Sequence, residues 1–366
     1  MSDEIIKENV LRLCDELYAQ LSALKPIESV CFTADEVQTI LSQEQTGAEA
    51  NYHLALEKFK ETNDKSIPTK VKRFVVYWGY PGAGKSVMTQ KLISRFGSEE
   101  DCLPFNIIDK DNHRDLFPNL FEHLKNGHLD ECERFAGVTI DYVRKILDLS
   151  LQSGQRSVIS IGSMGAGVEF KDNALKAMEY GYKPCAVYMA VPKEIAYLSN
   201  IYRSATLYDQ IIFQNKQLYP RLVSSEYFGR VVQMLPKMIE NIDAFQRENA
   251  THVDLMVVNR QDKLLYDSRK PHCHNVRDVI EKEENRLLNH DELIIINKQL
   301  YQIQQNMMYR AKANIYAPSQ SEVEAAKTAV YNIRELIKDN YFGATYQALP
   351  NPHHPPFLQF EAGLYR

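Results

Sequence analysis

The amino-acid sequence predicts an α/β protein with a doubly wound, mostly parallel sheet, N-terminal helices and a C-terminal helical appendage. Short runs of β-branched and aromatic residues alternate with helical patterns, and the runs are apolar almost throughout. Strands buried on both faces of a parallel sheet have this composition. The segments between the runs are long enough for crossover helices. The five runs are FVVYWG (74–79), FNIID (105–109), SVISIG (157–162), CAVYMAV (185–191) and DLMVV (254–258).

Helical patterns precede the first run. Apolar residues recur at helix spacing over residues 2–24, with Ser2 as the expected N-cap. A second helix is expected from Thr33, where Glu36 completes a capping box, and a third over residues 47–62.

Strand signals stop after residue 270. Residues 276–312 have a helical pattern, and another helix is expected from Ser319, with a capping box to Glu322, to about residue 339. We therefore predict three parts: an N-terminal helical segment (1–70), a central α/β domain (71–268) and a C-terminal helical subdomain (269–366).

Composition excludes several classes of function. The 366 residues are 44% hydrophobic and 25% charged, as in an ordinary globular protein. The net charge of -5 argues against broad, non-specific binding of nucleic acid. The first residues lack a basic region followed by an apolar core, and no apolar run is long enough to span a membrane. The six cysteines have no paired spacing, which favours reduced thiols. We expect a cytoplasmic protein without membrane contact; translocation as an effector, by a route that needs no signal peptide, is left open.

A nucleotide-binding motif follows the first run. Residues 79–86, GYPGAGKS, match G-x-x-x-x-G-K-[ST] between a predicted strand and a predicted helix. Glycines let backbone N–H groups surround a phosphate, and the helix N-terminus adds partial positive charge. Lys85 can reach the β- and γ-phosphates, and the Ser86 hydroxyl can hold Mg²⁺. The alternative is a glycine-rich turn that precedes a lysine by chance. The motif predicts a P-loop NTPase-type fold with ATP and Mg²⁺ as cofactors, and the residues expected to contact the nucleotide are Gly79, Tyr80, Pro81, Gly82, Ala83, Gly84, Lys85, Ser86 and Val87.

Two aspartates follow the second run, in NIIDKDNHRDLFP. Asp109 and Asp111 lie on one side of an extended segment because side chains alternate along it. At the carboxyl end of a parallel strand, a carboxylate can accept a proton from an attacking hydroxyl or hold Mg²⁺. The alternative is turn chemistry, since Asp and Asn favour turns.

Together these stretches resemble the zeta toxin family of P-loop kinases. In that family G-x-P-G-[AS]-G-K-[ST] is followed by D-x-D-x-x-[KR] and then His-Pro, which are matched here by 79–86, by DKDNHR (109–114) and by Phe117-Pro118. The resemblance covers about residues 30–268. Its later matches are YGYKPCAVYMAVPKEIAYLSNIYR (180–203), PRLVSSEYFGRVVQMLPKMIENI (220–242) and VDLMVVNRQDKLLYDS (253–268), the last with Asp262 where the family usually has Gly.

The resemblance implies an ATP- and Mg²⁺-dependent kinase. It implies transfer of the γ-phosphate to the sugar 3′-hydroxyl of UDP-N-acetylglucosamine or a related sugar nucleotide, and an antitoxin protein as partner. By the same resemblance Asp111 is the catalytic base, Asp109 can serve the metal shell, and Arg203 and Arg221 bracket the transferring phosphate. Planar guanidinium groups suit that task because they neutralise phosphoryl oxygens bidentately. Without the resemblance, a surface salt bridge is the ordinary role of an arginine.

Three departures from the family pattern affect the acceptor half of the site. The family has Glu-Gly-Thr and then an Arg that grips the substrate, whereas this chain has ISIGSMGAG (159–167). Arg144 falls where the family has a substrate-site Glu, and Phe117 replaces His. Either Arg144 or Arg156 takes over the diphosphate, or the acceptor is a nucleoside, an NAD-like dinucleotide or an antibiotic. The alternative from another class is a nucleotide-binding module without turnover.

Overall fold

The structure of the chain is a computed structural model that covers most of the sequence. The residues that it describes are 2–27, 32–64, 71–100, 102–109, 117, 119–124, 135–162, 167–218, 222–271 and 275–342.

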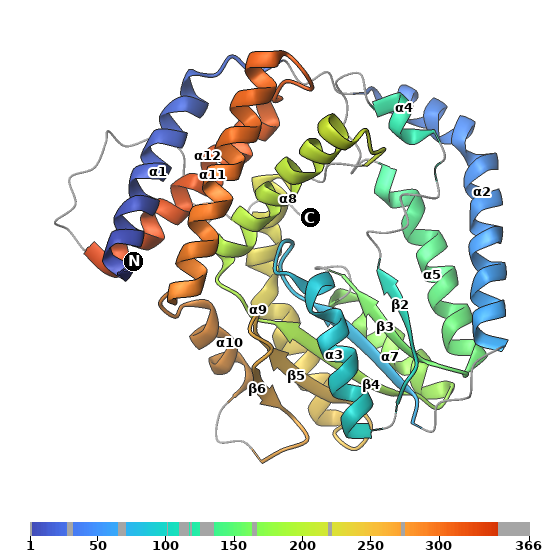
Figure 1. The fold of residues 1–366 in the computed structure, drawn as a ribbon. Coiled ribbons are helices and arrows are strands. Elements are labelled where there is room, and N and C mark those ends of the chain that lie inside the picture. The colour runs from blue at the N-terminus through green and yellow to red at the C-terminus, as the bar shows by residue number, and fades with distance from the viewer. Residues whose placement is uncertain are drawn as a thin grey trace, which may run out of the picture.

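A six-stranded sheet lies at the centre of this described part (Figure 1). The strands are β1 (Arg73–Trp78), β2 (Phe105–Asp109), β3 (Ser157–Ile161), β4 (Lys183–Met189), β5 (Asp254–Val258) and β6 (Leu264–Asp267). Their order is β2-β3-β1-β4-β5-β6, in which β1 to β5 are parallel and β6 is antiparallel to β5. The predicted fold class is confirmed, and the five apolar runs correspond to β1 to β5.

Helices connect the strands and cover both faces of the sheet (Figure 1). They are α3 (Lys85–Glu100), α4 (Leu120–Leu124), α5 (Ala136–Ser153), α7 (Phe170–Glu179), α8 (Lys193–Gln214) and α9 (Ser225–Glu248). Every residue of β1, β3 and β5 is buried, as expected for strands covered on both faces. The parallel order brings the carboxyl ends of the strands to one edge, where open α/β sheets bind their ligands.

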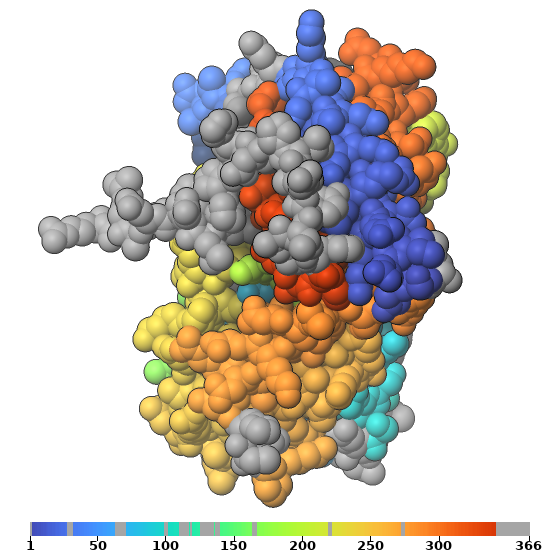
Figure 2. Space-filling model, turned by 90° about the vertical axis from the view of Figure 1, so that its left-hand side faces the viewer, coloured from blue at the N-terminus to red at the C-terminus, as the bar shows by residue number. Residues whose placement is uncertain are grey.

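The N-terminal helix packs against the C-terminal helices. These elements are α1 (Asp3–Ala23), α10 (Val276–Glu284), α11 (His290–Ala313), α12 (Gln320–Ile337) and a π-helical turn η3 (Lys338–Phe342). Gln304 of α11 donates to Gln20 of α1 at 3.2 Å, and Arg334 of α12 donates to Asp15 at 2.6 Å. Figure 2 shows α1, in blue, lying against the red and orange C-terminal helices. The three-part division of the chain stays a prediction, and its first and third parts are in contact.

Helix α2 (Ala34–Asp64) corrects one expectation. The sequence predicts two helices there, but the structure has one continuous helix of 31 residues. Gly47 lies inside this helix. A single glycine lowers helix stability by only about 1 kcal/mol, so it does not end the helix. The predicted capping box at its start is confirmed: Glu36 N donates to Thr33 Oγ1 at 3.2 Å, and Thr33 N donates to Glu36 Oε2 at 2.7 Å.

Two further features of the described residues bear on the chemistry of the chain. Cys14, Cys102 and Cys185 are buried and carry free thiols. Among the helices that the structure describes, none combines the length and the apolar character needed to cross a lipid bilayer.

Candidate nucleotide site

The loop between β1 and α3 has the backbone that its glycines permit. Gly82 has φ +79°, in the left-handed region that favours glycine. A Cβ on Gly82 would lie 2.1 Å from the carbonyl oxygen of Ala196 in α8, and a Cβ on Gly79 would lie 2.9 Å from that of Met189 in β4. The two glycines therefore allow the loop to approach α8 and β4 more closely than any other residue could.

Lys85 begins α3 and reaches back over this loop. Its ammonium donates to the carbonyl oxygens of Gly79 at 3.0 Å and Tyr80 at 2.8 Å. The loop closes on itself through a bond from Ala83 N to Tyr80 O at 3.1 Å. An ammonium group, a helix N-terminus and a glycine-rich turn thus lie together, and this combination attracts a polyphosphate. Val87, in the first turn of α3, is 82% exposed.

Ser86 and Asp109 meet at the carboxyl edge of the sheet. The Ser86 hydroxyl donates to Asp109 Oδ2 at 3.0 Å, although β2 and β1 are separated by β3. Asp109 is buried, whereas Ser86 remains open to solvent. A hydroxyl and a carboxylate are ligands suited to Mg²⁺, which usually takes one or two protein oxygens together with phosphate and water. The described segments contain no group of three or more His, Cys, Asp or Glu that could hold a metal, and Mg²⁺ with a nucleotide does not need one.

Arg203 lies on α8, the helix that touches the loop. Its Nη2 donates to Asn200 Oδ1 at 2.9 Å, and the backbone N of Asn200 would lie 3.0 Å from a Cβ on Gly82. The structure therefore places Arg203 one helical turn beyond the contact between α8 and the loop. Asp111 and Arg221 lie outside the described residues. The roles of these three residues stay predictions.

Tyr80 links the loop to the C-terminal helices. Its hydroxyl donates to Glu284 of α10 at 3.2 Å, and the Tyr188 hydroxyl donates to the same carboxylate at 2.5 Å. Burial raises the pKa of Glu284 from its ordinary value of 4.5 to about 7, although the two tyrosine hydroxyls favour the charged form. The Tyr80 ring also stacks on Phe228 of α9, with centroids 5.5 Å apart. Sequence reasoning missed Glu284, since nothing near it in the chain marks it as a neighbour of the loop.

Arg260 is a second residue that sequence reasoning missed. It follows Asn259 in the turn between β5 and β6, and its guanidinium donates to the carbonyl oxygens of Ala83 (Nε, 2.8 Å) and Gly82 (Nη2, 2.5 Å). Burial lowers the pKa of Arg260 to about 10, so the group stays charged at neutral pH. The Asn259-Arg260 pair within the matched stretch 253–268 was the available signal, but it gives no information on what the arginine contacts.

The acceptor side of the predicted site has one correction. Arg156 precedes β3 and donates to Asn106 near the start of β2, at 3.2 Å. Both residues lie at the amino edge of the sheet, whereas the loop at 79–86 lies at the carboxyl edge. Arg156 is therefore wrong as a candidate for gripping the diphosphate, because the length of the strands separates it from the nucleotide loop.

The three departures from the family pattern, at Arg144, Phe117 and residues 159–167, lie partly within the described residues. Arg144 is 55% exposed on α5 and donates to Glu169 at 2.8 Å and to Asp141 at 3.3 Å. Phe117 is buried in an apolar cluster with Leu120 and other residues of α2 and α4. Residues 163–166 of the glycine-rich stretch lie outside the described residues.

Comparison with known proteins agrees with this geometry. A sequence model of the Zeta toxin family matches residues 57–271. Toxin zeta of Streptococcus pyogenes is 25% identical over 230 residues, which cover 63% of this chain and 74% of that protein. Toxin zeta of Enterococcus hirae is 24% identical over 230 residues, which again cover 63% of this chain and 74% of that protein. A chain from the PezAT chromosomal toxin-antitoxin system of Streptococcus pneumoniae has the same fold, with a TM-score of 0.53 and 16% identity over 70% of this chain and 96% of that one.

Proposed function

Because the chain belongs to the zeta toxin family, whose members are kinase-like phosphotransferases, we propose that it is an ATP- and Mg²⁺-dependent kinase of a small-molecule hydroxyl. The observation that carries this proposal is the Ser86–Asp109 pair, 3.0 Å apart, beside the loop that Lys85 closes. From the start of α3 and the end of β2, these groups would supply the phosphate contacts and the metal ligands of a P-loop enzyme.

Each residue has a separate task in the proposed reaction. The loop 79–86 binds the triphosphate, and Lys85 exchanges its bonds to Gly79 and Tyr80 for the phosphate oxygens. Ser86 and Asp109 would hold Mg²⁺, which neutralises negative charge on the phosphates. Asp111 accepts the proton of the acceptor hydroxyl as the bond to phosphorus forms and the bond to ADP breaks.

The two arginines stabilise the group in transfer. Charge spreads over the three oxygens of the γ-phosphoryl group, and Arg203 and Arg221 are proposed to neutralise it from both sides. The position of Arg203 on α8, next to the helix surface that touches Gly82, supports its part of this arrangement.

We propose that the acceptor is a sugar nucleotide of the UDP-N-acetylglucosamine type. This step rests on the family resemblance. The chain's departures at 159–167 and Arg144 make nucleosides, NAD-like dinucleotides and antibiotics the natural competitors in an assay. An antitoxin protein is the proposed partner, because relatives include a member of a toxin-antitoxin system.

Transfer of label from γ-labelled ATP to a panel of these acceptors tests the proposal. The wild-type chain should label UDP-N-acetylglucosamine, and Asp111→Asn should lower the rate by about a hundredfold or more, as expected for loss of a general base. The ATP dissociation constant of this variant should stay within about a factor of two of the wild-type value, because Asp111 is not a phosphate ligand.

Asp148→Asn is the matched control. Asp148 is a partly exposed aspartate of α5 that pairs with Lys176 of α7 at 2.6 Å, and neither residue is assigned to the site, so the variant should keep the wild-type rate. Label on another acceptor instead would replace the sugar nucleotide but keep the kinase. Tight ATP binding without transfer to any acceptor would refute the kinase and leave a nucleotide-binding module.

A further inference from the structure

Arg260 contacts the backbone of the nucleotide loop. Its Nε and Nη2 groups donate to the carbonyl oxygens of Ala83 and Gly82, which belong to adjacent peptide units. A guanidinium presents its donors in a rigid planar fork, so one side chain can fix two neighbouring carbonyls at once.

Fixing these carbonyls also fixes the N–H groups that follow them. A trans peptide unit is planar, and its carbonyl oxygen and the next N–H point to opposite sides. The Ala83 carbonyl points to Arg260, so the N–H of Gly84 points away from the guanidinium. Backbone N–H groups held in this way are what a P-loop can offer to a phosphate. With φ values of +79° at Gly82 and +100° at Gly84, the loop has flexible residues that need such a restraint.

A residue outside the family match supports Arg260 through Ser199. The Nη2 of Arg260 also donates to Ser199 Oγ of α8 at 3.1 Å, and Gln299 of α11 donates to the same hydroxyl at 3.1 Å. The match to the family ends at residue 271, so Gln299 belongs to the C-terminal helices that the family pattern does not describe. The nucleotide loop is thus connected to α11 through one arginine and one serine.

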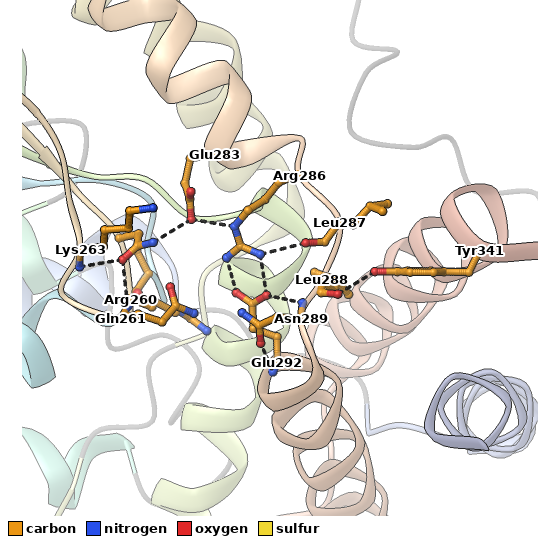
Figure 3. A network of polar contacts seen from close by, with 12 residues as sticks. Arg260, Gln261, Lys263, Glu283, Arg286, Leu287, Leu288, Asn289, Glu292 and Tyr341 are labelled. Atoms are coloured by element: carbon orange, nitrogen blue, oxygen red, sulfur yellow. Dashed lines mark hydrogen bonds and ion pairs between the residues drawn. The ribbon is translucent and has the colours of Figure 1, made fainter. Parts of the chain in front are cut away.

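A second network shapes the turn that carries Arg260 (Figure 3). Asn259 accepts from the backbone N–H groups of Gln261 and Lys263, and its amide donates to Glu283 of α10 at 3.1 Å. Arg286 donates to Glu283 and, in a bidentate contact, to Glu292 at the start of α11. The junction between α10 and α11 therefore sets the conformation of the turn.

We propose that Arg260 is a positioning residue for the nucleotide, and that the C-terminal helices hold it against the Gly82 and Ala83 carbonyls so that the loop is preformed for the β- and γ-phosphates. This inference rests on the proposed ATP binding. It assigns to residues 276–313 a part in nucleotide affinity. Preorganisation lowers the cost of binding, since the loop does not need to be ordered by the ligand.

The test is the affinity for two nucleotides that differ in the phosphates inside the loop. Trp78 is the only tryptophan in the chain and directly precedes Gly79, so energy transfer from it to a fluorescent ATP analogue reports occupancy. Competition with unlabelled ATP and AMP then gives both dissociation constants. For Arg260→Gln we expect the ATP dissociation constant to rise about tenfold or more, and that of AMP to change by less than about threefold, because charge-assisted hydrogen bonds order the part of the loop that AMP does not fill.

Arg95→Gln is the matched control. Arg95 donates to the backbone and side chain of Asp262 in the same turn, at 2.8 and 3.1 Å, and makes none of the described contacts to the loop carbonyls. Both Arg95→Gln and Arg260→Gln should lower thermal stability, but Arg95→Gln should leave the ratio of ATP to AMP affinity unchanged. Arg260→Lys keeps the charge but not the fork, so the ATP dissociation constant should rise by about threefold to tenfold even if Arg260→Gln does not fold.

The outcomes separate the two proposals. Wild-type affinity for ATP in Arg260→Lys and Arg260→Gln would overturn the positioning role while the nucleotide site stands. An equal loss in Arg95→Gln would also overturn it, because the effect would then come from the stability of the hairpin. Absence of ATP binding in the wild-type chain would overturn the proposed function, and this inference with it.

Discussion

Replacement of Glu284 by glutamine tests how this half-buried carboxylate affects stability. Tyr80 and Tyr188 donate to it, and Lys193 and Glu194 are the charged side chains near it. An acid whose pKa is raised by folding stabilises the fold below the pKa of the unfolded chain, and this stabilisation is lost as pH rises through the folded value. The window for Glu284 therefore runs from 4.5 to about 7.

The magnitude follows from the size of that window. A rise in pKa from 4.5 to about 7 corresponds to about 3 kcal/mol, and partial exposure of the side chain reduces it, so we expect about 1–3 kcal/mol. Glutamine has no charge to bury, and its amide can still bond both tyrosine hydroxyls. The unfolding free energy of Glu284→Gln should therefore rise by this amount relative to that of the wild-type chain as pH rises from about 5 to about 8. The difference should level off above that range.

Urea denaturation at a series of pH values measures the difference in unfolding free energy between variant and wild type. Glu281→Gln is the control, because Glu281 is an exposed residue of the same helix that pairs with Arg277, and its difference should not vary in this window. A difference for Glu284→Gln that is constant with pH, or that falls as pH rises, would refute the reasoning.

Two further substitutions test packing. Gly82→Ala places a Cβ 2.1 Å from the Ala196 carbonyl, so the variant should lose about 2–3 kcal/mol of unfolding free energy and should not bind ATP. Gly229 lies in helix α9, and a Cβ there would have nothing within 4 Å, so Gly229→Ala should raise the unfolding free energy by up to about 1 kcal/mol. Equal results for the two glycines by denaturant titration would contradict the clash. Arg310→Met leaves the buried Glu322 carboxylate without the bidentate partner that lies 2.8–3.0 Å away and should cost about 3–5 kcal/mol, with partial recovery when Glu322→Leu is added. A double variant less stable than the single one would argue against an uncompensated charge.

The strands of the fold could be predicted because their signal is local. Strands β1 to β5 are apolar almost throughout, since both faces of the sheet are covered, and each corresponds to one of the predicted runs. Strand β6 has four residues and is mostly half-buried, so no such run marks it. The sequence predicts two helices that meet near Gly47, whereas α2 is continuous. Helix propensity is a weak signal, because tertiary contacts can decide whether a helix continues.

The site was predictable only where a motif fixes the spacing. The structure brings Ser86 and Asp109 together, because parallel strands place their carboxyl ends at one edge, and their role as metal ligands stays a prediction. The same rule shows from the sequence alone that Arg156, which precedes β3, lies at the edge opposite the nucleotide loop. Arg260 and Glu284 could not be found, since a side chain's partners more than 170 residues away leave no local pattern.

The packing of α1 against α11 and α12 has a consequence during protein synthesis. About 270 residues separate α1 from α11, and a ribosome adds about 5–20 residues per second, so α1 waits roughly 10–50 s for its partners. Throughout that time its apolar face, which includes Val10, Leu13 and Leu17, has no native surface to cover it. Such a helix is a natural substrate for a chaperone that binds nascent chains.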